Sequence, residues 1–453
     1  MKKWTVMLLV LLLAMLFSAQ STKEKRPQFV EGELIVKLKS GEMQVARGLE
    51  SSMNITFSSS VGAEAVSVFK CEAGKEQEVS DALRQRDEVE YAEPNYLYYA
   101  SDTPNDPDFS KLWGMHNTGQ TGGTADADID AVEAWDIQKG DSTVLVAVID
   151  TGVDYTHPDL KANIWSNPGE TGTDNQGRDK RSNGVDDDNN GYIDDFHGWD
   201  FANNDNDPMD DNAHGTHVSG TIGAVGNNGV GVVGVNWRVK ILPLKFLTGG
   251  GSGSTDDAIA AIEYASSFGA HVMSNSWGGG GRSQALENAI VLSNNAGSLF
   301  VAAAGNEGTN NDTQPNYPSN YDVPNVLAVA AIDHNGVLSV FGPGGGNICG
   351  CENNPLPTPG SNYGATTVDL AAPGSAILST VPGGYNTFSG TSMATPHVAG
   401  VAALTLAQFP TLTNVQLKQH LMSSVDTRPS LMGKMVTGGS INAHKAVSVS
   451  PTL

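Results

Sequence analysis

The stretch Val144-Leu145-Val146-Ala147-Val148-Ile149-Asp150-Thr151-Gly152 joins six consecutive apolar residues to a carboxylate and a glycine. A continuous apolar run of this length, rich in β-branched residues, is typical of a strand that is buried on both faces. Open α/β sheets build their sites at the carboxyl ends of such strands, so Asp150 is a candidate site residue. An aspartate in this place is as commonly a structural cap, and the stretch alone leaves both roles open.

Apolar runs of strand length recur along the chain and alternate with helical stretches. We expect further strands at 240–246, 272–276, 299–304 and 326–331. We expect helices at 254–267, 282–295, 392–408 and 414–423. This alternation predicts an α/β fold with a doubly wound, mainly parallel sheet and helices on both faces. The acidic stretch 170–212 and the glycine-rich stretch 341–361 are expected to be loops.

The first hundred residues have a different pattern. Two lysines at 2–3, an apolar run at 6–17 and small polar residues after it form the layout of a secretory signal peptide. The run has 12 residues, whereas crossing a bilayer takes about 20. We therefore expect a signal peptide over 1–20, secretion to the extracellular space and no stable membrane anchor. Strand-like stretches and a helical stretch between 29 and 99 predict a small α+β domain ahead of the larger one.

The chain is strongly acidic and poor in cysteine. Its formal net charge is −24, and from Ser101 onward it has 36 acidic and 14 basic residues. Binding to nucleic acid needs a face of Lys and Arg, so we exclude nucleic acid as a partner. Three cysteines are too few for the disulfide framework of an exported protein. Cys349 and Cys351 could close a strained ring or remain thiols, and the sequence leaves both open.

Three motifs supply the groups that serine hydrolysis needs. They are the stretch ending in Asp150, then Asn212-Ala213-His214-Gly215-Thr216-His217-Val218, and Gly390-Thr391-Ser392-Met393-Ala394-Thr395-Pro396-His397-Val398. The chemistry requires a hydroxyl nucleophile, an imidazole that takes and returns its proton, and a carboxylate that orients the imidazole. A serine at a helix start is ordinarily only an N-cap, so the combination of motifs indicates catalysis, not any one of them.

All three motifs, in the chain order Asp, His, Ser, are similar to those of the subtilisin family. The resemblance extends from about 104 to 447 and includes Ser274-Asn275-Ser276-Trp277-Gly278 and Ala302-Ala303-Ala304-Gly305-Asn306-Glu307-Gly308. It implies a serine endopeptidase that works through an acyl-enzyme, with a catalytic domain over 102–450. It further implies that Ser392 is the nucleophile, that His214 is base and then acid with Asp150 behind it, and that Asn306 is an oxyanion donor.

The same resemblance predicts how a polypeptide substrate binds. Its backbone would pair with two segments, Gly251, Ser252, Gly253 and Ser276, Trp277, Gly278. Ala304 and Gly305 would form the wall of the main specificity pocket, with Asn316 near its base, and the Tyr317–Pro318 bond is expected to be cis. Such a pocket favours medium to large apolar side chains and broad specificity. The alternatives are a narrow-specificity processing protease and, from another class, an inactive calcium-binding adhesion protein.

The acid-rich loop predicts a calcium site. From Asp186 onward, oxygen-bearing side chains stand at positions 1, 3 and 5, with glycine at position 6 and a carbonyl at position 7, as in the front half of a calcium loop. Position 12 is His197, so Asp194 or Asp195 must complete the ligand set. The expected ligands are Asp186, Asp188, Asn190, the Tyr192 carbonyl and Asp195. A merely solvated acidic loop is the alternative.

Two more calcium sites follow from the resemblance. One is similar to a site of thermitase-like members and would use Asp200, Asp205, Asp207 and the Met209 carbonyl. The other would use Asp106, Asp159, the Asn228 side chain and the carbonyls of Val225, Val230 and Val232. Hard oxygen ligands select Ca²⁺ over transition metals, and bound calcium would supply the stability that disulfides do not. His217 and His397 are expected to be structural, because the His-Glu-x-x-His spacing of zinc proteases is absent.

The segment 27–100 resembles the family's inhibitory propeptide, particularly at Gly32-Glu33-Leu34-Ile35-Val36-Lys37. It would assist folding, occupy the cleft as an intramolecular inhibitor and be cut away near 99–103. The expected partners are polypeptide substrates and this propeptide, and the mature protein is expected to be a monomer.

Overall fold

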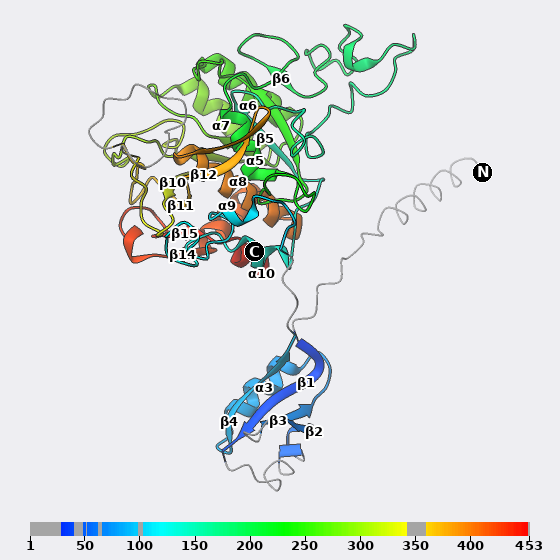
Figure 1. The fold of residues 1–453 in the computed structure, drawn as a ribbon, viewed down its shortest axis with the longest axis vertical. Helices are drawn as coiled ribbons and strands as arrows, with labels where there is room; N and C mark the ends of the chain where they lie inside the picture. Colours follow the sequence, from blue (N-terminus) through cyan, green and yellow to red (C-terminus); the bar gives the residue numbers. More distant parts are fainter. Residues whose placement is uncertain are drawn as a thin grey trace, which may run out of the picture. The chain divides into compact units, whose positions relative to one another are not determined.

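The chain divides into two units, Met1–Ala100 and Ser101–Leu453 (Figure 1). The computed structural model describes residues 29–39, 49–50, 52–61, 66–97, 103–341 and 359–451. The predicted signal peptide and the pair Cys349 and Cys351 lie outside these ranges. Within them, no helix is both long and apolar enough to cross a membrane.

The smaller unit contains an antiparallel sheet with the strand order β2-β3-β1-β4. Its elements are β1 Phe29–Leu38, β2 Thr56–Val61, β3 Val66–Lys70, α3 Glu76–Arg84 and β4 Val89–Tyr96. Leu34, Val36 and Leu38 alternate along β1 and pack with Leu83 of α3 in one apolar cluster. The predicted α+β domain is therefore confirmed. Strand β2 is largely polar and β4 contains a proline, so neither is evident from the sequence pattern.

A nine-stranded sheet runs through the larger unit in the order β14-β15-β11-β10-β9-β8-β5-β7-β6. Its strands are β5 Leu145–Asp150, β6 Trp199–Asp200, β7 Lys240–Lys245, β8 Val272–Asn275, β9 Leu299–Ala303, β10 Val326–Ile332, β11 Leu370–Pro373, β14 Val425–Thr427 and β15 Gly439–Ile441. Neighbouring strands are parallel except for the pair β14 and β15. Each of the five strands predicted from apolar runs is confirmed.

Helices cover both faces of this sheet. They are α4 Ala131–Trp135, α5 His214–Gly223, α6 Thr255–Ser267, α7 Gln284–Asn295, α8 Thr391–Gln408, α9 Asn414–Ser423 and α10 Ala443–Ser448, and a hairpin of β12 Ile377–Val381 and β13 Gly384–Phe388 lies outside the sheet. Val146 and Val148 of β5 pack in one cluster with residues of α5 and α8. Ala147 and Ile149 point the other way and pack with residues of α6 and α7. The predicted doubly wound α/β fold is confirmed.

Helix α8 is buried on all sides. Every residue from Thr391 to Leu406 is buried, as expected for a helix that is apolar all round. Pro396 lies inside this helix and has no N–H to donate. The carbonyl four residues earlier, that of Ser392, therefore receives no helical hydrogen bond and can accept one from elsewhere.

Charged residues end three neighbouring strands at the same edge of the sheet. In the strand registers, Asp150 of β5 pairs with Lys245 of β7, and Lys245 pairs with Asp200 of β6. This edge is the carboxyl edge of the parallel strands, where α/β folds build their sites.

Candidate active site

Asp150 and His214 are in direct contact at the end of β5. Asp150 is fully buried, and its Oδ1 accepts hydrogen bonds from the Thr151 N–H and from His214 Nδ1, each at 2.7 Å. A neutral imidazole carries hydrogen on one nitrogen only, so a proton on Nδ1 makes Nε2 the basic nitrogen of the ring. This pair can take a proton from a hydroxyl and stabilise the cation that results.

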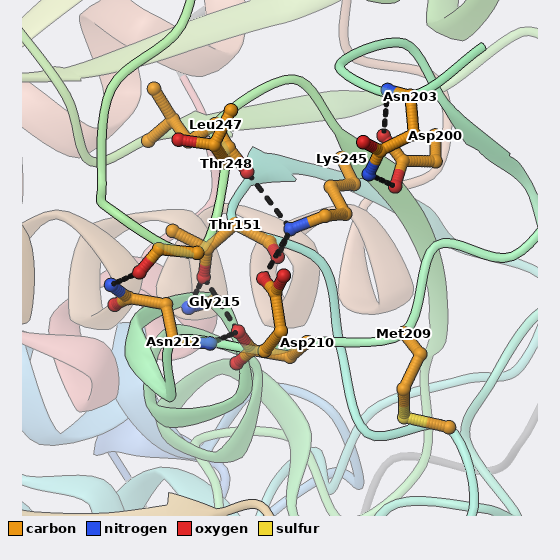
Figure 2. Close-up of polar contacts among 12 residues, drawn as sticks. Thr151, Asp200, Asn203, Met209, Asp210, Asn212, Gly215, Lys245, Leu247 and Thr248 are labelled. Carbon is orange, nitrogen blue, oxygen red and sulfur yellow. Dashed lines mark hydrogen bonds and ion pairs between the residues drawn. The ribbon is translucent and has the colours of Figure 1, made fainter.

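Asp210 holds the start of α5, whose first residue is His214. Its buried carboxylate accepts hydrogen bonds from the Asn212 N–H and the Thr151 hydroxyl (Figure 2). It also accepts hydrogen bonds from the N–H groups of Ala213 and Thr216 and from the Thr216 hydroxyl. The first N–H groups of a helix have no partner within the helix, and the Asp210 carboxylate is the acceptor for one of them, the Thr216 N–H. Asp210 therefore joins the turn after Asp150 to the helix that carries His214.

Ser392 is the second residue of α8 and forms a reciprocal pair with Ser276. The Ser392 hydroxyl donates to the Ser276 carbonyl, and the Ser276 hydroxyl donates to the Ser392 carbonyl, each at 3.0 Å. The Ser392 carbonyl is available because Pro396 provides no N–H. The pair fixes the candidate nucleophile against the segment that is predicted to bind the substrate backbone.

Asn306 contacts the start of α8 through the oxygen of its side-chain amide. Its Oδ1 accepts hydrogen bonds from the Thr391 N–H (2.8 Å) and the Thr391 hydroxyl (3.0 Å). A backbone N–H can only donate, so the oxygen of the amide must face Thr391 and the NH₂ group is directed elsewhere. A Cβ placed on Gly390 would lie 3.5 Å from Asn306 Nδ2, 3.6 Å from Asn306 Oδ1 and 3.6 Å from the Ser392 nitrogen. Two donors thus flank one small space, as stabilisation of an oxyanion requires.

The glycine before Asn306 is required by its surroundings. Gly305 has a φ of +109°, which side chains rarely adopt. A Cβ at this position would also lie 2.3 Å from Asn362 Nδ2. Glycine here lets β9 end in the turn that directs Asn306 toward α8.

A cleft of about 480 Å³ brings these groups together. His214, Asn306 and Ser392 line it, and so do all six residues predicted to pair with the substrate backbone: Gly251, Ser252, Gly253, Ser276, Trp277 and Gly278. Ala304, Gly305 and Asn316 are not among its lining residues in the described part of the chain. Asn316 nevertheless lies against the cleft wall, because a Cβ on Gly278 would come within 2.9 Å of its Nδ2. The Tyr317–Pro318 bond is cis, as predicted.

Comparison with known proteins identifies the family. A model described as the Subtilase family matches residues 141–439, which include Asp150, His214, Asn306 and Ser392. This chain belongs to the subtilase family. A model of the fervidolysin N-terminal prodomain matches residues 17–95, so this subtilase carries an N-terminal prodomain.

Individual relatives agree with this family membership. The thermophilic serine proteinase of Bacillus sp. (strain AK1) is 36% identical over 440 residues, which cover 94% of this chain and 90% of the relative. Thermitase of Thermoactinomyces vulgaris is 37% identical over 347 residues, which cover 76% of this chain and 99% of thermitase. A solved protease structure from Pseudoalteromonas arctica PAMC 21717 matches with a TM-score of 0.56 and 30% identity, over 77% of this chain and 99% of that one. The subtilase is a thermitase-like serine endopeptidase.

Three carboxylates of the subtilase gather in the acidic loop. Oxygen atoms of Glu170, Asp188 and Asp195 lie within 4.8 Å of one another. Burial raises the pKa of Glu170 to about 7 and also raises the pKa of Asp195. One oxygen of Glu170 accepts the Asp187 N–H, while Oε2 is buried without a hydrogen-bond partner. A divalent cation would satisfy this oxygen and offset the repulsion between the carboxylates.

The other residues predicted for this loop lie close to the cluster. Asn190 donates its side-chain amide to Asp195 (2.8 Å), and its N–H lies 3.1 Å from Asp186 Oδ1 and 3.2 Å from Asp188 Oδ1. Asp186 also accepts the Gly191 N–H, and the Tyr192 ring packs against Tyr264. Glu170 is missing from the sequence prediction, because it precedes the calcium-loop spacing and no local pattern connects it with Asp188.

The second predicted set begins at the end of β6 and continues through the loop that follows it. Asp200 and Asp205 exchange backbone hydrogen bonds, and the Asp200 carboxylate accepts the N–H and side-chain amide of Asn203. Asp207 accepts the Tyr155 hydroxyl at 2.9 Å and the Met209 N–H at 3.3 Å. Burial raises the pKa of Asp200.

The third predicted set joins segments that are far apart in the sequence. Asp106 accepts the N–H of Asn228, and Asp159 accepts the Asn228 side-chain amide and the Val232 N–H. Burial raises the pKa of both Asp106 and Asp159. The other members of the set also lie here, since the Val230 N–H donates to Asn228 Oδ1 and the Val225 N–H to the Asp159 carbonyl.

His217 and His397 are buried next to backbone carbonyls. His217 Nε2 lies 2.9 Å from the Ile377 carbonyl, and His397 Nδ1 lies 2.8 Å from the Met393 carbonyl. Burial lowers the pKa of His217 to about 3 and that of His397 to about 4. Both rings are therefore neutral at physiological pH, which fits the structural role that the sequence predicts.

Proposed function

We propose that this subtilase is a secreted, calcium-stabilised endopeptidase of broad specificity with a preference for apolar side chains. The observation that carries the proposal is the lining of the cleft. It contains Phe246, Leu247, Trp277, Leu286 and Tyr317, and none of the described lining residues is Asp, Glu, Lys or Arg. A processing protease that selects basic residues would need acidic groups there, so the lining favours the broad enzyme over that alternative.

In the proposed mechanism, the Ser392 hydroxyl leaves the Ser276 carbonyl and bonds to the carbonyl carbon of the substrate. Its proton passes to His214 Nε2, while Asp150 holds the ring through Nδ1. The negative charge that forms on the substrate oxygen is stabilised by Asn306 Nδ2 and the Ser392 N–H, and loss of one such donor costs about 3 to 4 kcal/mol. His214 then gives the proton to the leaving amine, the C–N bond breaks and an acyl-enzyme remains. Water, with His214 as base, releases the acid and restores Ser392.

Calcium is proposed at three centres, because each brings together several carboxylates, at least one of them buried, without a matching number of basic side chains. The first would be held by Glu170, Asp188 and Asp195, together with neighbouring oxygens of the loop. The second and third would be held by the sets around Asp200 and Asp159. The ion would supply positive charge that only the folded chain can bind, and so would stabilise the fold.

We also propose how the chain is divided in use. Residues 1–20 would direct secretion, 27–100 would inhibit the enzyme, and 102–450 would form the mature catalytic domain. The match to a prodomain supports the second assignment. The first cut between the two parts would be made by the enzyme itself.

Processing of a Ser392→Ala variant in a protease-free host tests the catalytic assignment. We expect this variant to fold and to keep its prodomain attached. Ser430→Ala is a matched control, since its hydroxyl donates to the Gly336 carbonyl and Ser430 does not line the cleft. The control should mature normally. Mature protein from the Ser392 variant would refute the role of Ser392.

Digestion of a mixed peptide library, read by mass spectrometry, tests specificity. We expect cleavage after many medium and large apolar residues. Cleavage confined to one short motif, or to charged residues, would favour the narrow processing protease.

A further inference from the structure

Lys245 is a buried cation at the edge of the active site. It is the last residue of β7, and only 1% of its surface is exposed. An ammonium group is costly to bury unless every proton finds an acceptor. Lys245 Nζ donates to the Thr151 carbonyl (2.7 Å), the Leu247 carbonyl (3.0 Å) and Asp211 Oδ1 (2.6 Å), so its three donors have three acceptors (Figure 2).

The strand registers place this charge between two aspartates. Lys245 pairs with Asp150 of β5 on one side and with Asp200 of β6 on the other. Neighbouring strands lie about 4.8 Å apart. Val148 and Ile241 point to the face of the sheet that α5 covers. Because side chains alternate along a strand, Asp150 and Lys245 point to that same face.

The three acceptors belong to three different parts of the site. Thr151 directly follows Asp150 in the chain. Asp211 stands three residues before His214. Leu247 lines the cleft and leads into the glycine-rich segment 250–253, which also lines it. One ammonium group therefore connects the residue after Asp150, the segment that leads to His214 and the segment that forms one wall of the cleft.

We propose that Lys245 is a positioning residue for the reaction: it holds these three segments in register, and its buried charge favours the neutral form of His214. The proposal rests on the roles given above to Asp150 and His214. A buried methionine or leucine could fill the same space without needing three acceptors. Packing alone therefore does not require a lysine at this position.

The charge effect has a definite sign. Turnover needs neutral His214, and a cation nearby makes the protonated ring less favourable. Removing that cation should therefore move the acid limb of the pH profile of kcat/KM to higher pH. The charged and titratable groups around His214 are Asp150 at the end of β5, Asp154 after it, Lys245 on β7, Asp210 and Asp211 before α5, His217 on α5 and His397 on α8.

The test compares Lys245→Met with Lys240→Met, both in millimolar calcium. Lys240 begins the same strand and also donates to two carbonyls, those of Ala162 and Ile164, each at 3.2 Å, but it pairs with Leu145 at the other end of β5 from Asp150. We expect Lys245→Met to lower kcat/KM about tenfold or more and to move the acid limb up by roughly 0.5 to 1 pH unit. Lys240→Met should lose stability without either change. Lys245→Arg keeps the charge and should keep the limb in place.

Asp211→Asn gives an independent answer, and it decides the question if Lys245→Met does not fold. The Asp211 side chain is 58% exposed, so its replacement leaves the core intact. It removes a negative charge near His214 and should move the acid limb to lower pH, opposite to Lys245→Met. If the acid limb of the pH profile of kcat/KM does not move in Asp211→Asn, or in a folded Lys245→Met, the proposal is overturned. Activity retained by Ser392→Ala would instead overturn the catalytic assignment itself, so the two failures are distinguishable.

Discussion

Asp210 is a carboxylate surrounded by donors alone. Its two oxygens accept three N–H groups and two hydroxyls. Asparagine in its place would turn an NH₂ group toward some of these donors. We expect Asp210→Asn to lower the free energy of unfolding by about 2 to 3 kcal/mol, as loss of a buried charged acceptor does. It should lower kcat more than it raises KM, because His214 begins the helix that Asp210 caps.

Denaturant unfolding in the Ser392→Ala background, with kinetics of the active form, checks this prediction. Asp312→Asn is the control, because Asp312 also accepts several donors, from Thr366 and Thr367, but these are not residues of α5. Equal effects of the two substitutions on kcat would contradict a special role for Asp210.

Single residues could be predicted from the sequence where the motif is local. Asp150, His214, Asn306 and Ser392 each stand in a short stretch that resembles the family's own. Asp210, Lys245 and Glu170 do not, because the partners that define them lie elsewhere in the chain. Asp210, for example, is one of 13 acidic residues between 170 and 212, and nothing nearby marks it as the one that caps α5.

At the scale of elements, the start of α8 depends on a hydroxyl from another segment. Pro396 leaves the Ser392 carbonyl without a helical donor, and the Ser276 hydroxyl supplies one. We expect Ser276→Ala to cost about 1 to 2 kcal/mol of unfolding free energy, since a buried carbonyl loses its donor. Thermal unfolding of the inactive form measures this. In the double variant Ser276→Ala, Pro396→Ala the restored N–H can bond the same carbonyl, so the cost should shrink, and equal costs in both backgrounds would contradict the explanation.

The helices and strands that could be predicted from the sequence are those with a clear apolar pattern. Strands β9 and β10 are wholly apolar, β5 and β7 are apolar apart from charged end residues, and β8 begins with two apolar residues. The four predicted helices begin and end within two residues of their expected bounds. Helix α5 is not expected from His214-Gly215-Thr216-His217-Val218-Ser219-Gly220-Thr221-Ile222-Gly223, which is rich in glycine and threonine. It forms because it is buried throughout and capped by a carboxylate outside the helix. Tertiary contacts outweigh local propensity there.

At the scale of the whole molecule, the acidic loop makes stability depend on calcium. Ten carboxylates lie between Asp186 and Asp211, and they repel one another without a counter-ion. We expect the unfolding temperature of the Ser392→Ala form to rise with calcium concentration, as for any ligand bound only by the folded state. Glu170→Gln and Asp205→Ala should each weaken that rise. Calorimetry in excess chelator and in millimolar calcium measures it.

The exposed Asp322 provides the control for the calcium experiment. Asp322→Asn removes one negative charge outside the three proposed centres and should leave the calcium dependence unchanged. An unfolding temperature that is the same with chelator and with calcium would show that the loop is a solvated surface.

Stability should also depend on pH through Asp128. This residue is buried, accepts the N–H groups of Asn117 and Asp130, and has a pKa raised from 3.8 to about 7 by burial. The folded state thus holds a proton that the unfolded state releases, so this contribution to stability is lost as pH rises from about 4 to about 7. Asp128→Asn should flatten the fall in unfolding free energy over that window, whereas Asp322→Asn, at an exposed residue, should not. A slope unchanged by Asp128→Asn would refute the assignment.

The burial of α8 has a consequence for when activity can begin. A helix without a solvent-facing stripe can bury all its sides only when the sheet and the helices around it are in place. Ser392, the second residue of this helix, is therefore held in its final position only once this packing is complete. A newly made chain therefore passes through its partly folded, protease-sensitive states before its own active site is complete.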